Sequence, residues 1–135
     1  MPRLHVLAAG TRLPGWAEQA CAEYAKRMPR GYEVARVAVK RAERLRAALP
    51  KGARLVALDE HGRDLTTAQF ARLLEVETAF VIGGPDGLDP GLKREAALLL
   101  RVSSFTLPHA LAQVVLLEQL YRAATLATGH PYHRG

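Results

Sequence analysis

Short apolar runs alternate with helix-like segments along this 135-residue chain, and this pattern restricts its fold more than any other feature. Parallel strands need a crossover between them, usually a helix, so the alternation predicts an α/β fold: a mainly parallel sheet with helices on both faces. No linker or internal repeat interrupts it, and we expect a single domain over residues 1–135. The predicted strands are Arg3–Ala9, Glu33–Val39, Arg54–Asp59, Ala79–Ile82 and Val102–Leu107, with a turn at His61-Gly62. The predicted helices are Gly15–Met28, Lys40–Leu49, Thr66 or Thr67 to about Glu75, about Pro90 to Leu100 and about Ala110 to Thr128.

Composition excludes several classes of protein. Cys21 is the only cysteine, so an intrachain disulfide and a cysteine metal cluster are impossible. No two histidines have the H-E-x-x-H spacing of a zinc site, and we expect no metal. The N-terminal MPRLHVLAAG is too short and interrupted for a signal peptide, and no apolar run approaches the roughly 18–20 residues that span a bilayer. These observations predict a soluble, cytoplasmic protein with no membrane partner.

Positive charge is concentrated in one part of the chain. The segment Lys26–Arg54 contains ten Lys or Arg residues and two acids, Glu33 and Glu43, in a chain whose net charge is +6. A concentrated basic segment on an otherwise near-neutral domain is typical of proteins that bind polyanions, and it favours a nucleic-acid partner. The alternative is a solvated, arginine-rich surface.

The last predicted helix is apolar around most of its circumference. Its apolar residues are Leu111, Val114, Val115, Leu116, Leu117, Leu120, Tyr121 and Leu126. Glu118, Arg122 and Thr125 form its only clear polar stripe. A helix that is apolar on more than one side is buried on more than one side, which favours a homodimer with this helix at the interface. The alternative is a central core helix of a monomer.

Two predicted strand ends lie close together in the sequence, and strand ends are where α/β sheets bind ligands. The first is followed by the glycine-rich turn Gly83–Gly87, which matches neither GxGxxG nor a Walker loop and is equally consistent with an ordinary turn. The second, Val102–Leu107, stops at Pro108.

The polar tail His130-Pro131-Tyr132-His133-Arg134 is unusual for a chain terminus. It combines two imidazoles that titrate near neutrality, a phenol able to stack on a base and a fixed cation. The alternative is a disordered end.

Several blocks of the sequence together resemble the RlmH family, the small methyltransferases that modify a pseudouridine of large-subunit ribosomal RNA. They are AAGTRLPGW, RLVALDEHGR, VIGGPDGL, SSFTLPHALAQVVLLEQLYRA and the final HPYHR, and they extend over nearly the whole chain. The departures are small: Asp86 stands where glutamate is expected, Ala110 where proline is common, and the segment from Val39 to Arg54 is short.

The resemblance implies a SPOUT fold, in which the C-terminal part of a parallel α/β sheet is threaded into a deep trefoil knot. It also implies a homodimer and S-adenosylmethionine as the cofactor. The substrate would be N3 of a pseudouridine in 23S ribosomal RNA, within the assembled ribosome. Carried onto this sequence, the cofactor contacts are Leu58, Gly83, Val102, Ser103, Ser104, Phe105, Thr106 and Leu107.

The chemistry suggests roles for the tail. The pseudouridine N3 carries a proton at neutral pH, and that proton must leave before or during attack on the methyl group. His133 is a candidate base, Arg134 a candidate for stabilising the developing anion or holding phosphate, and Tyr132 a candidate for stacking on the base.

Two alternatives stay open from the sequence. The chain could be a non-catalytic RNA-binding module on a methyltransferase scaffold, in which case it would not bind S-adenosylmethionine. It could also be a related methyltransferase with a transfer-RNA target, which a comparison of methyl transfer into ribosomes and transfer RNA separates.

Overall fold

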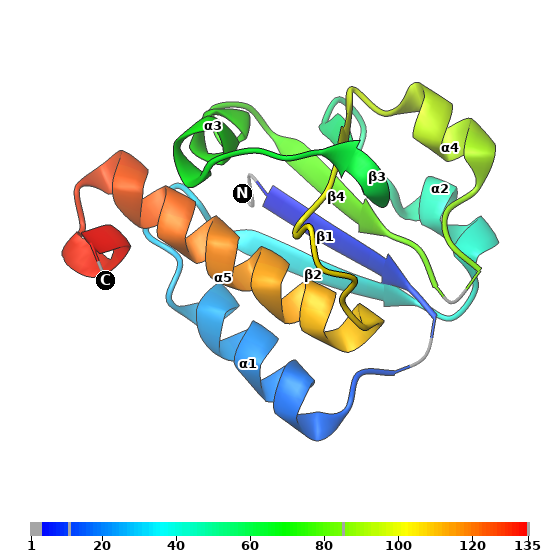
Figure 1. Ribbon diagram of the computed structural model, residues 1–135, viewed down its shortest axis with the longest axis horizontal. Helices are drawn as coiled ribbons and strands as arrows, with labels where there is room; N and C mark the ends of the chain where they lie inside the picture. Colours follow the sequence, from blue (N-terminus) through cyan, green and yellow to red (C-terminus); the bar gives the residue numbers. More distant parts are fainter. Residues whose placement is uncertain (1–3, 11, 85, 135) are drawn as a thin grey trace.

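The computed structural model describes residues 4–10, 12–84 and 86–134, and the side chains of His133 and Arg134 lie outside this description. Its five strands form one sheet in the order β2-β1-β4-β3-β5, and all neighbouring strands are parallel (Figure 1). The predicted parallel α/β sheet is confirmed, although Arg3, the predicted start of the first strand, is not among the described residues. The strands are β1 (Leu4–Ala9), β2 (Val34–Val39), β3 (Arg54–Arg63), β4 (Thr78–Ile82) and β5 (Leu98–Leu100).

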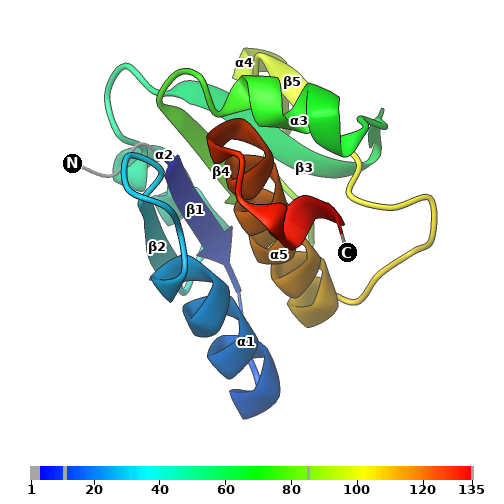
Figure 2. The same ribbon diagram turned by 90° about the vertical axis from the view of Figure 1, so that its left-hand side faces the viewer.

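Helices cover both faces of the sheet, as predicted. One face carries α1 (Gly15–Lys26), α3 (Thr67–Leu73) and α5 (His109–Thr128), and the other carries α2 (Leu45–Ala48) and α4 (Pro90–Glu95). Figure 2 shows α1 and α5 side by side along the first face. Two short 3₁₀ helices, η1 (Ala42–Arg44) and η2 (Pro131–Arg134), complete the elements.

The side chains of β1 show how one strand supplies both cores. Leu4 and Val6 point into the core beneath α1, α3 and α5, whereas Leu7 and Ala9 point into the core beneath α2 and α4. All four are buried, because successive strand residues face opposite sides of a sheet that is covered on both. β3 follows the same rule with Val56 and Ala57, which face the two cores in turn.

The structure differs from the prediction between residues 90 and 107. Helix α4 ends at Glu95, Leu98–Leu100 form β5, and the predicted strand Val102–Leu107 is a loop. A short leucine run fits a helix and a strand equally well by periodicity. Pairing with Val56, Ala57 and Leu58 of β3 decides for the strand.

Two further boundaries differ. β3 continues through the predicted turn at His61-Gly62 to Arg63, with an irregularity after Leu58, and Gly62 allows this because a Cβ there would lie 2.6 Å from the Leu99 carbonyl oxygen. The predicted helix Lys40–Leu49 is only the two short turns η1 and α2.

Helix α5 is the longest element and packs against both α1 and α3. Glu118 and Arg122 of the predicted polar stripe form an ion pair, with 2.8 Å between an Arg122 guanidinium nitrogen and a Glu118 carboxylate oxygen. Thr125 is buried and donates its hydroxyl hydrogen to the Arg122 carbonyl. It is therefore not on the surface, although the sequence pattern placed it in the polar stripe. No helix in the described part of the chain is long and apolar enough to cross a membrane.

Candidate active site

The carboxyl ends of β3 and β4 are neighbours at one edge of the sheet. From β3 the chain continues to α3 on one face, and from β4 it continues to α4 on the other. Connections that leave neighbouring strands in opposite directions open a crevice between the strand ends, where α/β proteins bind ligands. A pocket of about 150 Å³ lies there, lined by Leu58, Asp59, Glu60, Ile82, Leu100, Arg101, Val102, Ser103, Phe105, Thr106, Leu107 and Ala112.

Most of the predicted cofactor residues meet in this pocket: Leu58, Val102, Ser103, Phe105, Thr106 and Leu107. Ser104 is exposed in the same loop and does not line the pocket, and Gly83 follows the lining residue Ile82 without lining the pocket itself. The prediction therefore selected the loop that lines this pocket, although it assigned that loop to a strand.

The loop 101–108 is held at its ends and open in its middle. At one end the Arg101 amide donates to the Arg63 carbonyl at 2.9 Å, and the Arg101 Nε donates to an Asp64 carboxylate oxygen at 2.7 Å. At the other end the Pro108 carbonyl accepts from the first turn of α5. Within the described residues, no backbone–backbone hydrogen bond involves residues 102–107. Apart from the Phe105 N–H, which donates to the Ser103 side chain, their N–H and C=O groups are therefore available to a ligand.

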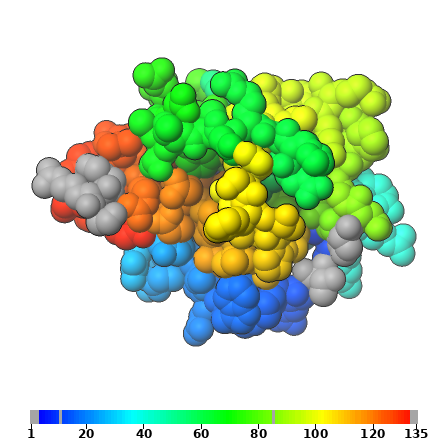
Figure 3. Space-filling view, in the orientation of Figure 1, coloured from blue at the N-terminus to red at the C-terminus, as the bar shows by residue number. Residues whose placement is uncertain are grey.

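The side chains of the loop make its surface partly apolar. Phe105 is 80% exposed, which is unusual for a residue of its size. Its amide donates to the Ser103 hydroxyl oxygen at 2.9 Å, which fixes the local turn. In Figure 3 the loop, in yellow, lies on the molecular surface below the green end of β3.

Two acids at the pocket were not predicted as site residues. Asp59 and Glu60 follow Leu58 where β3 departs from regular pairing. The Asp59 side chain is only 13% exposed, and one of its oxygens lies 3.4 Å from the Lys93 ammonium. Carboxylates at the end of a parallel strand are well suited to accept hydrogen bonds from ribose hydroxyls. The signal in the sequence is the LDE that ends a buried strand.

The glycine turn after β4 is closed on itself. The Gly87 amide donates to the Gly84 carbonyl at 2.9 Å, and Gly87 has a φ of 77°. A Cβ on Gly83 would lie 2.5 Å from the carbonyl carbon of Gly87. Glycine is therefore required at position 83 for the turn to close, which is a reason separate from the cofactor contact that the resemblance implies.

His109 connects this turn to α5, a role that the sequence did not reveal. The Gly83 carbonyl accepts a hydrogen bond from its imidazole, and its Nε2 lies 2.9 Å from the Gln113 amide nitrogen. Burial lowers the pKa of His109, and the hydrogen bond to Gly83 opposes this shift. The imidazole therefore favours its neutral form and ties the end of β4 to the first turn of α5.

The tail lies at the other end of α5. The Tyr132 hydroxyl donates to a Glu118 carboxylate oxygen at 3.0 Å, its ring centroid is 4.5 Å from that of Tyr121, and the Arg122 guanidinium carbon is 4.9 Å from the ring centroid. Burial, then hydrogen bonds with Tyr24 and Glu118, raise the pKa of Tyr132. The side chains of His133 and Arg134 are outside the described part, so their predicted roles are untested.

The tail and the pocket of one chain are not brought together. Ala112 lines the pocket and Gly129 ends α5, so 17 residues of helix separate them, about 26 Å at 1.5 Å per residue. The four residues from Gly129 to His133 extend at most about 14 Å. In this structure the tail packs against Glu118 and Tyr121 of α5, and it does not line the pocket of its own chain.

Residues 2–133 match the family described as "Predicted SPOUT methyltransferase". The ribosomal RNA large subunit methyltransferase H of Burkholderia thailandensis is 49% identical over 98% of this chain and 99% of its own length. The Burkholderia mallei protein of the same description is 48% identical with the same coverage. The chain belongs to the RlmH family of SPOUT methyltransferases.

Solved structures of other SPOUT proteins share the fold. The SpoU methyltransferase AviRb from Streptomyces viridochromogenes, in complex with AdoMet, has a TM-score of 0.54 at 20% identity, covering 87% of this chain and 56% of its own. The A. aeolicus TrmH/SpoU tRNA modifying enzyme has a TM-score of 0.59 at 12% identity, covering 96% of this chain and 79% of its own. The SPOUT-like α/β fold thus holds at low identity.

The pocket fits the cofactor that the SPOUT family implies. S-adenosylmethionine carries an adenine ring, a ribose with two hydroxyls and an amino-acid part. Unpaired backbone groups of residues 102–107 suit the adenine edge, apolar side chains such as Leu58 and Ile82 suit its faces, and Asp59 suits the ribose.

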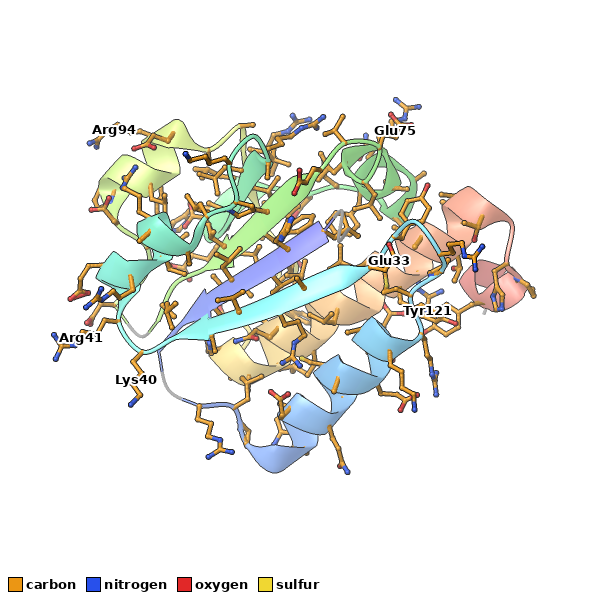
Figure 4. All side chains as sticks on the ribbon, turned by 180° about the vertical axis from the view of Figure 1, so that it is seen from behind. Glu33, Lys40, Arg41, Glu75, Arg94 and Tyr121 are labelled. Atoms are coloured by element: carbon orange, nitrogen blue, oxygen red, sulfur yellow. The ribbon has the colours of Figure 1, made fainter. Side chains whose placement is uncertain are left out.

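The basic segment Lys26–Arg54 is divided between the two ends of the sheet. Lys40 and Arg41 follow the carboxyl end of β2, whereas Lys51 and Arg54 lie at the amino end of β3 (Figure 4). Some of its cations are paired within the chain, as Arg36 is with Glu18 at 2.9 Å. Lys40 and Arg41 therefore carry the positive charge at the edge of the sheet where the pocket lies. The ten basic residues of the segment do not form one continuous basic surface.

Proposed function

We propose that this RlmH-family chain is an S-adenosylmethionine-dependent methyltransferase that acts on 23S ribosomal RNA, at N3 of a pseudouridine within the assembled ribosome. The observation that carries the proposal is 49% identity, over 98% of the chain, to a ribosomal RNA large subunit methyltransferase. The open backbone of the loop 102–107 at the carboxyl edge of the sheet supports it. A ribosomal substrate implies a cytoplasmic enzyme.

The cofactor, when bound, supplies a methyl group activated on a sulfonium. The chain holds that group with the loop 102–107, whose backbone groups orient the adenine, and with Leu58, which contributes an apolar wall. Asp59 is proposed to bind the ribose. Because methyl transfer needs an in-line approach at close range, the main task of these residues is positioning.

The tail supplies the proton chemistry. His133 is proposed to take the N3 proton of the pseudouridine, and Arg134 to stabilise the anion that forms. The packing of Tyr132 on Tyr121 and its hydrogen bond to Glu118 hold the tail against α5, so Tyr132 positions its two neighbours. Stacking of Tyr132 on a base is a second proposed role, for which its ring would have to leave this packing.

The site is proposed to be completed by a second copy of the chain. The pocket lies at one end of α5 and the tail begins at the other, with about 26 Å of helix between Ala112 and Gly129, and the two do not meet within one chain. In a homodimer that packs through α5, the tail of one copy can lie over the pocket of the other. The half-buried Leu111, Val114 and Val115 of α5 leave apolar surface for this contact.

We also propose that the C-terminal part is knotted. The chain leaves β5 at the edge of the sheet and enters α5 beside the carboxyl end of β4, so residues 101–108 cross the end of β3 between them. Such a crossing is what a threaded trefoil requires, and knots are rare enough to need direct proof. An experimental structure whose trace unties when its two ends are drawn apart would refute the knot.

The test of function is transfer of a tritiated methyl group from S-adenosylmethionine. We expect incorporation into ribosomes that lack the modification and none into bulk transfer RNA. Incorporation into transfer RNA alone would favour the related methyltransferase with that target. If a saturating concentration of cofactor leaves the melting temperature unchanged and no label is transferred, the chain is a non-catalytic RNA-binding module.

A further inference from the structure

A second cleft lies beside the cofactor pocket, on the other side of the first turn of α5. Its volume is about 580 Å³. Helix α5 contributes His109 and Gln113 to this cleft and Ala112 to the pocket, so the two sites share one helical turn. The cleft opens between the end of β1 and the edge strand β2 and is not used by the chemistry proposed above.

The walls of the cleft are apolar. Val6 and Ala8 of β1, Ala38 of β2 and Leu13 line it on the face of the sheet that α1 and α5 cover. Ala38 is exposed, which makes the wall accessible from solvent. Mostly apolar walls with a few polar groups are typical of small-molecule and base-binding sites.

One buried polar group in the cleft has an unused acceptor. Gln113 is only 4% exposed. His109 donates one ring N–H to the Gly83 carbonyl, so its Nε2 is the acceptor for the Gln113 amide N–H at 2.9 Å. Among the described residues, the Gln113 Oε1 has no hydrogen-bond partner. A buried amide oxygen without a partner is costly, and a ligand in the cleft would satisfy it.

The rim of the cleft is basic. Arg12 and Lys40 line it and are exposed, and neither forms an ion pair with another described residue. Arg36 also lines the cleft, but Glu18 neutralises it through two hydrogen bonds of 2.9 and 3.0 Å. In Figure 4 Lys40 projects from the end of β2. Two free cations above an apolar cavity suit a ligand that carries phosphate on an apolar ring.

We propose that this cleft holds one unpaired nucleotide of the RNA substrate, next to the nucleotide that is methylated. Its base lies against Ala8 and Ala38 with its hydrogen-bonding edge on Gln113, and its phosphate lies between Arg12 and Lys40. A primary amide offers an acceptor beside a donor, which is the pattern that pairs with base edges. The proposal rests on the proposed function, because it assigns a second contact to the same RNA.

The first test is Gln113→Leu, which keeps the side-chain volume and removes the acceptor. We expect the affinity for an RNA oligonucleotide with the sequence of the target loop to fall about 3- to 10-fold, the effect of one hydrogen bond. Calorimetric affinity for S-adenosylmethionine should not change. Gln19→Leu, on the exposed side of α1, is the matched control and should bind RNA like the unmodified protein.

A second variant covers the case in which Gln113→Leu misfolds. Ala38→Trp fills the cleft from the edge strand without disturbing the core, and it should weaken RNA binding about tenfold or more while cofactor binding persists. If both folded variants bind and methylate RNA normally, the cleft is not an RNA site. If both instead sediment as monomers while the unmodified protein is a dimer, the cleft is covered by a second copy and the proposal is wrong. If the unmodified protein methylates no ribosomes, the proposed function itself fails.

Discussion

A complementation experiment tests whether one active site is built from two chains. One partner lacks residues 130–135 and keeps an intact pocket, and the other carries Thr106→Trp, which places a bulky ring in the pocket from an exposed loop position and keeps the tail. Each variant alone should be inactive or nearly so. Co-expressed with two different affinity tags, they should form heterodimers in which the intact pocket of one chain meets the intact tail of the other.

The structure sets the expected magnitude. The helix α5 places about 26 Å between Ala112 in the pocket and Gly129, and the tail extends about 14 Å from Gly129 to His133. Any activity that the two variants regain together must therefore come from a site shared between two chains. A purified heterodimer has one functional site of two, so its methyl transfer should be about half that of the unmodified dimer. Random pairing without purification makes half of the dimers heterodimers and gives about one quarter of the full rate.

The assay is tritiated methyl transfer into unmodified ribosomes, with both homodimers measured at the same protein concentration. Sedimentation must show that each variant is a dimer, because loss of association would also abolish activity. A heterodimer no more active than the two homodimers would refute a site shared between chains. Full activity of the truncated homodimer would instead show that the tail has no catalytic role.

Three further outcomes follow from the local geometry. Gly83→Ala should lower the free energy of unfolding by about 1–3 kcal/mol in urea titrations, because its Cβ would overlap the backbone of the turn, whereas Gly15→Ala, with open space around its Cβ, should change it little. Burial lowers the pKa of His109 in the folded state, so its contribution to the free energy of unfolding should be fully present above the unfolded pKa of about 6.5 and should be lost as pH falls below that value. Thermal melts of His109→Gln should therefore show a smaller loss of stability at low pH. RNA affinity should fall steeply with salt, and the slope of log K against log salt should shrink by about 1 for each of Lys40→Ser and Arg41→Ser that contacts a phosphate; unchanged slopes would remove them from the RNA surface.

The strands that were predicted well carry one of two local signals. β3 and β4 contain apolar residues at consecutive positions, which is the pattern of a sheet covered on both faces, whereas β1 and the half-exposed β2 show alternation. The prediction was wrong from Ala96 to Leu107 because this region contains two apolar runs and only one of them forms a strand. Pairing with β3 selects Leu98–Leu100, and this long-range contact has no local signal.

The site could be predicted only in part for a similar reason. The family resemblance selected the loop from Val102 to Leu107, but Asp59 and Glu60 reach the pocket through the irregular end of β3, which no turn rule indicates. The sequence indicates only that His109 lies at the start of a helix and Gln113 in its interior. Their hydrogen bond and their shared cleft depend on where α5 begins relative to β4, and that is fixed by tertiary packing.

Helix α5 explains how a chain of this size divides its functions. Its first turn stands between the cofactor pocket and the second cleft, and His109 fixes this turn to the end of β4. Its last turns carry Glu118, which holds the tail through Tyr132. A rigid helix of 20 residues keeps these two ends about 30 Å apart in every conformation that preserves it. If the tail supplies the proton chemistry, as proposed, it can meet the reagents at the other end where two such helices pack together, and the length of α5 is therefore our reason for proposing a second copy in the site.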